Sequence, residues 1–161
     1  MRFLIAAVAA TAVLATAGCS RAQTPPLQDP VSFMAQNALQ PGVKTLPSGI
    51  QYKVIKSGPA DGPHPTPEDL VKVMYEGSLT NGKVFDSSYA KGQPVTFQLK
   101  GLIPGWIDAM QYMRPGDEWM IYIPPRLGYG EEGAGPIPPN AMLIFRLELQ
   151  AVGAAAGPPS Q

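Results

Sequence analysis

The fold is decided by one stretch of the chain, which reads Val71-Lys-Val-Met-Tyr75-Glu-Gly-Ser-Leu-Thr-Asn81-Gly82-Lys-Val-Phe85-Asp86-Ser-Ser88. Apolar and polar residues alternate from Val71 to Tyr75, as they do in a β-strand with one buried face. Asn81-Gly82 then separates this segment from the one that contains Phe85. Such a pair favours a two-residue type I′ turn, in which both central residues have a positive φ. The stretch therefore predicts an antiparallel hairpin.

The same period of two recurs along the chain, in the segments 49–56, 95–99, 119–123 and 143–149. The chain also contains 19 Pro and 17 Gly in 161 residues, a content that favours turns over long helices. We therefore expect five or six antiparallel strands.

One segment breaks this period between Gly105 and Met113. Its apolar residues are spaced i, i+3, i+4 and i+7, at Trp106, Ala109, Met110 and Met113, and Arg114-Pro115-Gly116 ends it. A short helix here must bury its apolar stripe against the sheet. The predicted fold class is α+β and β-rich: a curved antiparallel sheet of five or six strands, a half-barrel, wrapped around one short helix.

The charges argue against one class of partner. The chain has 12 Lys plus Arg and 12 Asp plus Glu, so it has no basic surplus for nucleic acid. We expect one domain, no nucleic-acid binding and no metal, because no cluster of metal-ligand residues is visible.

The N-terminus is typical of an export signal. Arg2 precedes an uncharged apolar run, Phe3 to Ala17, and small residues follow. The run is short for a membrane span, which needs roughly 20 residues. We predict a signal peptide at 1–18, with a transmembrane or buried helix as the alternative.

Cys19 is the one cysteine of the chain, so it has no partner for an internal disulfide or a metal site. Thr16-Ala-Gly-Cys19 resembles the lipobox of bacterial lipoproteins, although Thr16 stands where Leu is usual. We predict lipidation of Cys19 and anchoring to the periplasmic face of a bacterial membrane, the outer one in bacteria with two. Cleavage by an ordinary signal peptidase after Ala17 or Ala22, giving a soluble periplasmic protein, is the alternative; a cysteine without a special role is the third.

Three further segments complete the predicted organisation. Residues 19–41 form a Pro-rich tether with a short helix, because Asp29-Pro30 is an N-cap signal and Pro41-Gly42 a stop. Residues 42–152 form the folded unit, and 153–161 a disordered tail.

Several aromatic side chains are candidates for a binding site. Tyr75, Phe97 and Phe145 are in phase with the inward positions of their strands, and each alone is consistent with a core residue. Trp106 begins the predicted helix, and Tyr129 lies in a loop between two glycines, where aromatic residues are often functional. Together they predict an apolar cup of the kind that suits a proline.

The polar candidates are fewer. Asp86 ends a predicted strand, and it is either a turn-forming residue or a carboxylate at the mouth of the cup. His64 lies in a Pro-rich loop and is expected at the surface. Glu131 and Glu132 read as a solvated pair, with acid–base work as the alternative.

These motifs together resemble a known family. The stretch from Thr45 to Val152 is similar to FKBP-type peptidyl-prolyl cis-trans isomerases, and its opening phrase to their bacterial macrophage-infectivity-potentiator branch. The resemblance is carried by Gly-Lys-Val-Phe85-Asp86-Ser-Ser, Ile103-Pro-Gly-Trp106, Tyr129-Gly and Ile137-Pro-Pro-Asn-Ala.

The resemblance implies the residues of a proline site. It assigns catalysis to Asp86, Tyr129, Phe85, Trp106 and Phe145, and substrate binding to Tyr75, Val95, Phe97, Leu102, Ile103 and Ile137. By this resemblance Trp106 is the floor under the proline ring, with Tyr75, Phe97 and Phe145 as walls. The Ile103 N–H and the Tyr129 hydroxyl hold substrate carbonyls, and Asp86 faces the reacting imide.

The implied function is a cofactor-free isomerase that accelerates rotation about X-Pro bonds in exported polypeptides. Macrolides like tacrolimus or rapamycin are further ligands by resemblance. Non-catalytic alternatives are a proline-peptide binding module or chaperone of the cell envelope, and a structural lipoprotein.

The chain also departs from the family's pattern. Lys91 stands near a common Arg, Val95 replaces a common aromatic residue, and the loop 131–136 lacks the His of some members. These changes predict a wider pocket with a less tightly held Asp86. The segment before the domain has few residues able to form a helix, so we expect a monomer.

Overall fold

The structure is a computed structural model that describes residues 24–153. The predicted signal peptide, Cys19 and the tail after residue 153 lie outside the described residues. The elements, in chain order, are α1 (Pro30–Asn37), β1 (Val43–Thr45), β2 (Gln51–Lys56), β3 (Leu70–Ser78), β4 (Val84–Ser87), β5 (Val95–Gln98), the 3-10 turn η1 (Leu99–Gly101), α2 (Pro104–Met110), β6 (Glu118–Ile123), η2 (Pro125–Leu127) and β7 (Leu143–Gly153). Between residues 24 and 153, none of the helices has the length and apolarity to cross a membrane.

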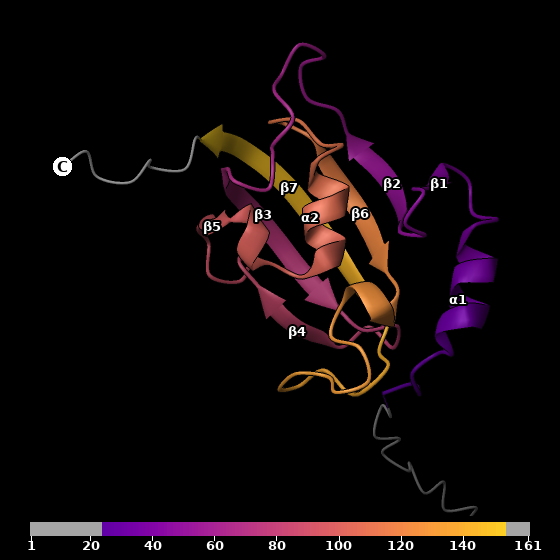
Figure 1. The fold of residues 1–161 in the computed structure, drawn as a ribbon. Helices are drawn as coiled ribbons and strands as arrows, with labels where there is room; N and C mark the ends of the chain where they lie inside the picture. Colours follow the sequence, from indigo (N-terminus) through magenta and orange to yellow (C-terminus); the bar gives the residue numbers. More distant parts are fainter. Residues whose placement is uncertain (1–23, 154–161) are drawn as a thin grey trace, which may run out of the picture.

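The strands form one antiparallel sheet, which curves around α2 without closing (Figure 1). Its order is β1-β2-β6-β7-β3-β4, and β5 pairs with β3 beside β4. The predicted fold class is confirmed. The sheet has 7 strands rather than five or six. The added strand is β1, whose three residues are too few to show an alternating pattern.

The predicted β3–β4 hairpin is present, but its predicted turn type is wrong. Gly82 has a φ of +81°, whereas Asn81 is not among the residues with positive φ. The Gly82 N–H donates to Leu79 O at 2.9 Å, and the Leu79 N–H donates to Lys83 O at 2.9 Å. The connection is therefore a three-residue loop, in which an ordinary turn is followed by a left-handed glycine.

The predicted apolar stripe of α2 faces the sheet. Trp106 is 4% exposed, and Ala109, Met110 and Met113 are fully buried. The helix ends at Met110, and Met113 follows in the turn after it. Gly105 allows the close approach to β6, because a Cβ there would lie 2.5 Å from the Ile123 Cγ2. This packing places Trp106 in the middle of the curved sheet.

The short helix expected within the N-terminal tether is α1, and it is docked on the domain beside β2 (Figure 1). The Asn37 Nδ2 donates to the Gln51 Oε1 at 2.8 Å, and the Gln51 Nε2 donates to Met34 O at 2.8 Å. The Phe33 and Tyr122 rings are 5.9 Å apart. Asn37 and Gln51 are both buried, so their mutual hydrogen bond offsets the cost of burying two amides.

Candidate functional site: an aromatic pocket with a polar mouth

A cavity of about 700 Å³ opens between residues of α2, β4 and the loop that joins β6 to β7. Its volume is in the range of small-molecule sites. It is lined by Tyr75, Phe85, Asp86, Phe97, Gly101, Leu102, Ile103, Trp106, Tyr129, Ala134, Gly135, Pro136, Ile137 and Phe145. Every pocket residue predicted above is among them except Val95. That side chain is partly buried and packs against the core instead.

The base of the cavity is an aromatic cluster, which we call the aromatic floor: Tyr75, Phe97, Trp106 and Phe145. The Trp106 ring makes an edge-to-face contact with each of the others, at centroid distances of 5.3 Å to Tyr75, 6.1 Å to Phe97 and 5.1 Å to Phe145. Such contacts are the favoured geometry of aromatic pairs. Trp106, Tyr75 and Phe145 are buried, so the floor belongs to the core and to the cavity at once.

Gly77 in β3 makes room for this arrangement. Phe85 and Phe145 meet edge to face at 5.6 Å above it. A Cβ at residue 77 would lie 2.6 Å from the Phe85 ring and 2.7 Å from the Phe145 ring. The close approach of both rings to the β3 backbone therefore requires a residue without a side chain.

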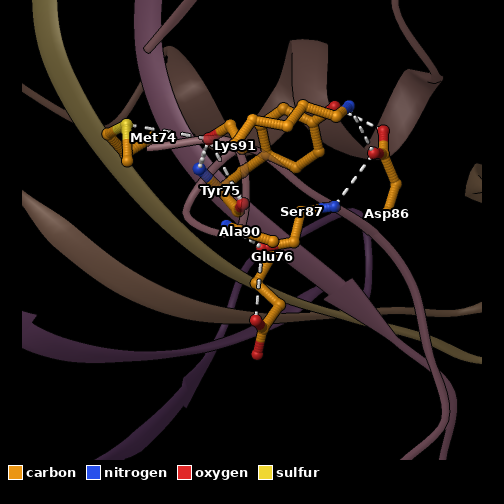
Figure 2. Close-up of polar contacts among 8 residues, drawn as sticks. Met74, Tyr75, Glu76, Asp86, Ser87, Ala90 and Lys91 are labelled. Atoms are coloured by element: carbon orange, nitrogen blue, oxygen red, sulfur yellow. Dashed lines mark hydrogen bonds and ion pairs between the residues drawn. The ribbon is translucent and has the colours of Figure 1, made fainter. Parts of the chain in front are cut away.

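The rim of the cavity carries the polar groups of Asp86 and Tyr129, and Lys91 pairs with Asp86 from outside the lining. We call Asp86, Lys91 and Tyr129 the polar mouth. The Tyr75 hydroxyl, at the edge of the floor, donates a hydrogen bond to the Asp86 Oδ2 (Figure 2). The Asp86 Oδ1 accepts from the Ser87 N–H at 2.9 Å and from the Lys91 Nζ at 3.1 Å. The Asp86 and Lys91 side chains are 44% and 59% exposed, so their ion pair is a surface pair.

These contacts fix the protonation of the site. The hydrogen bond from Tyr75, and then the Lys91 ammonium, hold the pKa of Asp86 below its usual value. Burial, and then the hydrogen bond to Asp86, raise the pKa of Tyr75 far above its usual value. At neutral pH the pocket therefore presents one ionised carboxylate that is held by a protonated phenol.

The loop 128–140 forms the remaining wall, with Tyr129 at its start and Ile137 near its end. The amides of Ala134 and Ile137 each donate to the other's carbonyl at 2.9 Å, which folds the loop into a small hairpin. Gly133 has a φ of +70°, and a Cβ there would lie 2.4 Å from Ile137 O. The loop is therefore held in shape by its own backbone, and Tyr129, which is 40% exposed, projects from it.

Sequence reasoning missed four lining residues, Gly101, Ala134, Gly135 and Pro136. Their side chains are small and unreactive. No sequence pattern therefore indicates that these four residues line a pocket. Conversely, His64 is at the surface as expected, with its Nδ1 3.1 Å from Met113 O. Glu131 and Glu132 are exposed and do not line the cavity.

Two potential ligand donors lie on the wall of the cavity. Among residues 24–153, neither the Ile103 N–H nor the Tyr129 hydroxyl donates a hydrogen bond. Ile103 directly precedes α2, and both residues line the cavity. They are therefore free to donate to carbonyl oxygens of a bound chain.

Comparison with protein families gives two matches. Residues 62–150 match the model described as FKBP-type peptidyl-prolyl cis-trans isomerase. Residues 9–54 match the model described as the domain amino terminal to FKBP-type peptidyl-prolyl isomerase, which includes α1.

Individual proteins agree with these matches. The chain is 54% identical to the peptidyl-prolyl cis-trans isomerase Mip of Coxiella burnetii over 122 residues, which is 75% of this chain and 52% of that protein. It is 44% identical to the outer membrane protein MIP of Legionella longbeachae over 126 residues, or 78% of this chain and 53% of that protein. The chain thus spans about half the length of the curated relatives it matches.

A solved structure shows the same fold. The crystal structure of a peptidyl-prolyl cis-trans isomerase from Pseudomonas syringae matches with a TM-score of 0.72 and 42% identity, over 77% of this chain and 90% of that one.

Proposed function

Because this chain belongs to the FKBP-type peptidyl-prolyl cis-trans isomerase family, we propose that its pocket accelerates cis–trans rotation about X-Pro bonds in exported polypeptides. One observation carries the proposal: an aromatic floor of four rings lies opposite a single ionised carboxylate. This combination suits an uncharged ring next to an amide, and the reaction needs no nucleophile.

The chemistry follows from the amide bond. Its rotation is slow because resonance is lost at the twisted transition state, a barrier of ~18–20 kcal/mol. A planar amide is more dipolar than a twisted one, so water stabilises the ground state more than the transition state. An apolar cavity removes this preference, while fixed groups hold the flanking chain. A 10⁴-fold acceleration corresponds to about 5.5 kcal/mol of differential stabilisation.

Each lining group has a place in this scheme. The Trp106 ring supports the prolyl ring, and Tyr75, Phe97 and Phe145 surround it, while Phe85 packs over Phe145 at the mouth. The free Ile103 N–H and Tyr129 hydroxyl donate to carbonyls on either side of the proline. Leu102 and Ile137 complete the apolar wall. The ionised Asp86 faces the imide, where charge redistributes as the bond twists.

The proposed location rests on the sequence and on the relatives. One relative is named an outer membrane protein. With the export signal at 1–18 and the lipobox-like Cys19, this supports an exported protein that is anchored by lipid on the periplasmic side. Metabolic labelling with a fatty acid tests the anchor: label that is lost in Cys19→Ser is expected, and an unlabelled wild type rejects it. Lipidation and the monomeric state stay predictions.

The isomerase proposal is tested by a coupled assay of X-Pro isomerisation in a short peptide. We expect catalysis by the wild-type protein, a large loss in Trp106→Ala and smaller losses in Asp86→Ala and Tyr129→Phe. Unfolding of each variant by urea is measured beside its activity, because Trp106 also belongs to the core. If the wild-type protein binds the peptide but the isomerisation rate equals the uncatalysed rate, the isomerase proposal is wrong. The pocket would then belong to a binding module or chaperone. Inhibition by a tacrolimus-like macrolide tests the same pocket independently.

A further inference from the structure

One edge of β3 has a gap beside the pocket. On this edge β5 pairs with Leu70–Val73 and β4 pairs with Glu76–Ser78. Met74 and Tyr75 lie between these two pairings and face neither strand. The backbone N–H and C=O of Tyr75 therefore need partners from elsewhere, because a buried peptide group without a hydrogen bond is costly.

Ser88 fills this gap with both its backbone and its side chain. Its N–H donates to Tyr75 O at 2.8 Å. Its Oγ accepts from the Tyr75 N–H at 2.8 Å and also lies 3.3 Å from Tyr75 O and 3.7 Å from the Met74 Sδ. The Ser88 side chain is fully buried. A serine hydroxyl thus takes the place of a strand partner for the peptide N–H of Tyr75.

The same residue is connected to the polar mouth on its other sides. Asp86 lies two residues before Ser88, and it accepts the hydrogen bond from the Tyr75 phenol (Figure 2). The Lys91 N–H donates to Ser88 O at 3.1 Å, and the Lys91 ammonium pairs with Asp86. The contacts form a closed ring, from the Tyr75 backbone through Ser88 to Asp86 and back through the phenol.

We propose that Ser88 is a positioning residue of the pocket: by holding the backbone of Tyr75, its hydroxyl sets the geometry of the hydrogen bond between Tyr75 and Asp86. The predicted effect of Ser88 on activity rests on the proposed isomerase function. Its structural part, the link from Ser88 to the Asp86 carboxylate, holds whether or not the pocket catalyses.

Ser87 provides a matched control. It is the same residue type, 7% exposed, and its Oγ lies 3.1 Å from the Ala90 N and 3.3 Å from the Glu76 Oε2. In Figure 2 this Glu76 side chain points away from Asp86. Ser87→Ala therefore removes a buried hydroxyl and its hydrogen bonds in the same segment without touching Tyr75, and it keeps the Ser87 N–H that binds Asp86.

The test measures two quantities in wild type and in each variant. The first is the pKa of the Asp86 carboxyl, from carbon NMR of the labelled protein, and the second is kcat/KM on an X-Pro peptide. In Ser88→Ala we expect the Asp86 pKa to rise toward its ordinary value, because the phenol donates less well, and kcat/KM to fall about 5- to 10-fold. In Ser87→Ala we expect the pKa to be unchanged and kcat/KM to fall less than about 2-fold. Ser88→Cys keeps a hydrogen-bonding atom at the γ position, although a weaker and larger one, so we expect an intermediate effect.

A double-mutant cycle separates positioning from general loosening. In a Tyr75→Phe background the phenol is absent, so adding Ser88→Ala should leave the Asp86 pKa where Tyr75→Phe puts it. Additive pKa changes, an unchanged pKa in both Ser88 variants, or an equal effect of Ser87→Ala would each overturn the proposal. If the wild-type protein binds the peptide without turnover, the isomerase proposal fails. The Asp86 pKa in the Ser88 and Ser87 variants still tests the positioning role of Ser88.

Discussion

The aromatic floor and the polar mouth enclose one cavity, but they differ in what else they do. Trp106 is 4% exposed and touches three other rings, so the floor is part of the hydrophobic core. Asp86 and Lys91 are about half exposed, and their contacts with the rest of the fold are few. Changes in the floor should therefore affect stability and binding together, whereas changes in the mouth should affect function with little cost in stability.

The largest expected effect is that of Trp106→Ala. Truncating a buried Trp costs about 3–5 kcal/mol of unfolding free energy, and here it also removes the base of the pocket. Trp119 is a matched control, because it is 6% exposed and stacks on Tyr52 at 4.4 Å, away from the cavity. Both alanine variants should lose similar stability in urea unfolding. Isomerase activity per folded molecule should be lost only in Trp106→Ala; equal activity losses would mean that the floor acts through stability alone.

Gly77→Ala tests the support beneath the floor. The added Cβ would meet the Phe85 and Phe145 rings at 2.6 and 2.7 Å, closer than real contacts allow. We expect a loss of about 1–3 kcal/mol in unfolding free energy and weaker binding of proline peptides, because the rings must shift into the cavity.

Gly153→Ala is the corresponding control at the end of β7, where a Cβ meets nothing within 4 Å. It should change stability by less than about 0.5 kcal/mol. If Gly77→Ala also changes the unfolding free energy by less than about 0.5 kcal/mol, the Phe85 and Phe145 rings can move aside at little cost, and the predicted clash is wrong.

Asp86→Asn tests the mouth. We expect isomerase activity to fall about 10-fold and unfolding free energy by less than about 1 kcal/mol, because an exposed ion pair contributes little. Asp69 is a control of the same type: it is an acidic turn residue with a lowered pKa, held by the Thr66 N–H and hydroxyl, and it lies outside the lining. Asp69→Asn should leave activity unchanged. A stability loss in Asp86→Asn as large as in Trp106→Ala would erase the distinction between floor and mouth.

The stability difference between wild type and Asp86→Asn should depend on pH. The folded pKa of Asp86 is lowered from 3.8, chiefly by the Tyr75 hydrogen bond and then by Lys91. The carboxylate therefore contributes stability at pH values above 3.8, and this contribution is lost as the pH falls through the folded value. The difference in unfolding free energy between wild type and Asp86→Asn should shrink over that acidic range in urea titrations. A difference that grows on acidification would contradict the assigned direction.

The contrast between floor and mouth also explains what the sequence could predict. Alternating apolar residues specify strands and a spacing of three and four specifies a helix, so the half-barrel and its buried Trp106 follow from the pattern. The β1 strand, three residues long, carries no such period. The docking of α1 depends on the hydrogen bond between Asn37 and Gln51. Polar side chains like these are usually expected at the surface, and only the fold shows that the two amides are each other's partners.

The site was predictable to the extent that its residues have distinctive side chains. Trp106 and Asp86 belong to the motifs that carry the family resemblance, and the structure gathers them with the other rings of the floor around one cavity. Gly101 and Gly135 contribute backbone alone, and nothing about a glycine indicates that it lines a pocket. The turn at Asn81-Gly82 was misassigned because an Asn-Gly pair fits two hairpin loops, and the choice depends on how β3 and β4 are aligned. The Ser88 contacts likewise depend on where β4 ends and β5 begins.

The smallest expected effect is that of Lys91→Arg, which sharpens the comparison within the mouth itself. The Lys91 ammonium lies 3.1 Å from the Asp86 Oδ1, while the Asp86 Oδ2 accepts a hydrogen bond from the Tyr75 hydroxyl. A guanidinium presents two parallel donors, and each carboxylate oxygen can accept more than one hydrogen bond, so Arg can bind both oxygens without displacing the phenol. We expect the Asp86 pKa to fall further, stability to rise by less than about 0.5 kcal/mol, and kcat/KM to change less than about 3-fold. The measurements are carbon NMR and the peptide assay at low and high salt, because an exposed pair weakens with ionic strength. A change in kcat/KM as large as that of Asp86→Asn would mean that the position of the carboxylate is set mainly by the residue at 91, and the hydrogen bond from Tyr75 would then be the weaker of the two constraints.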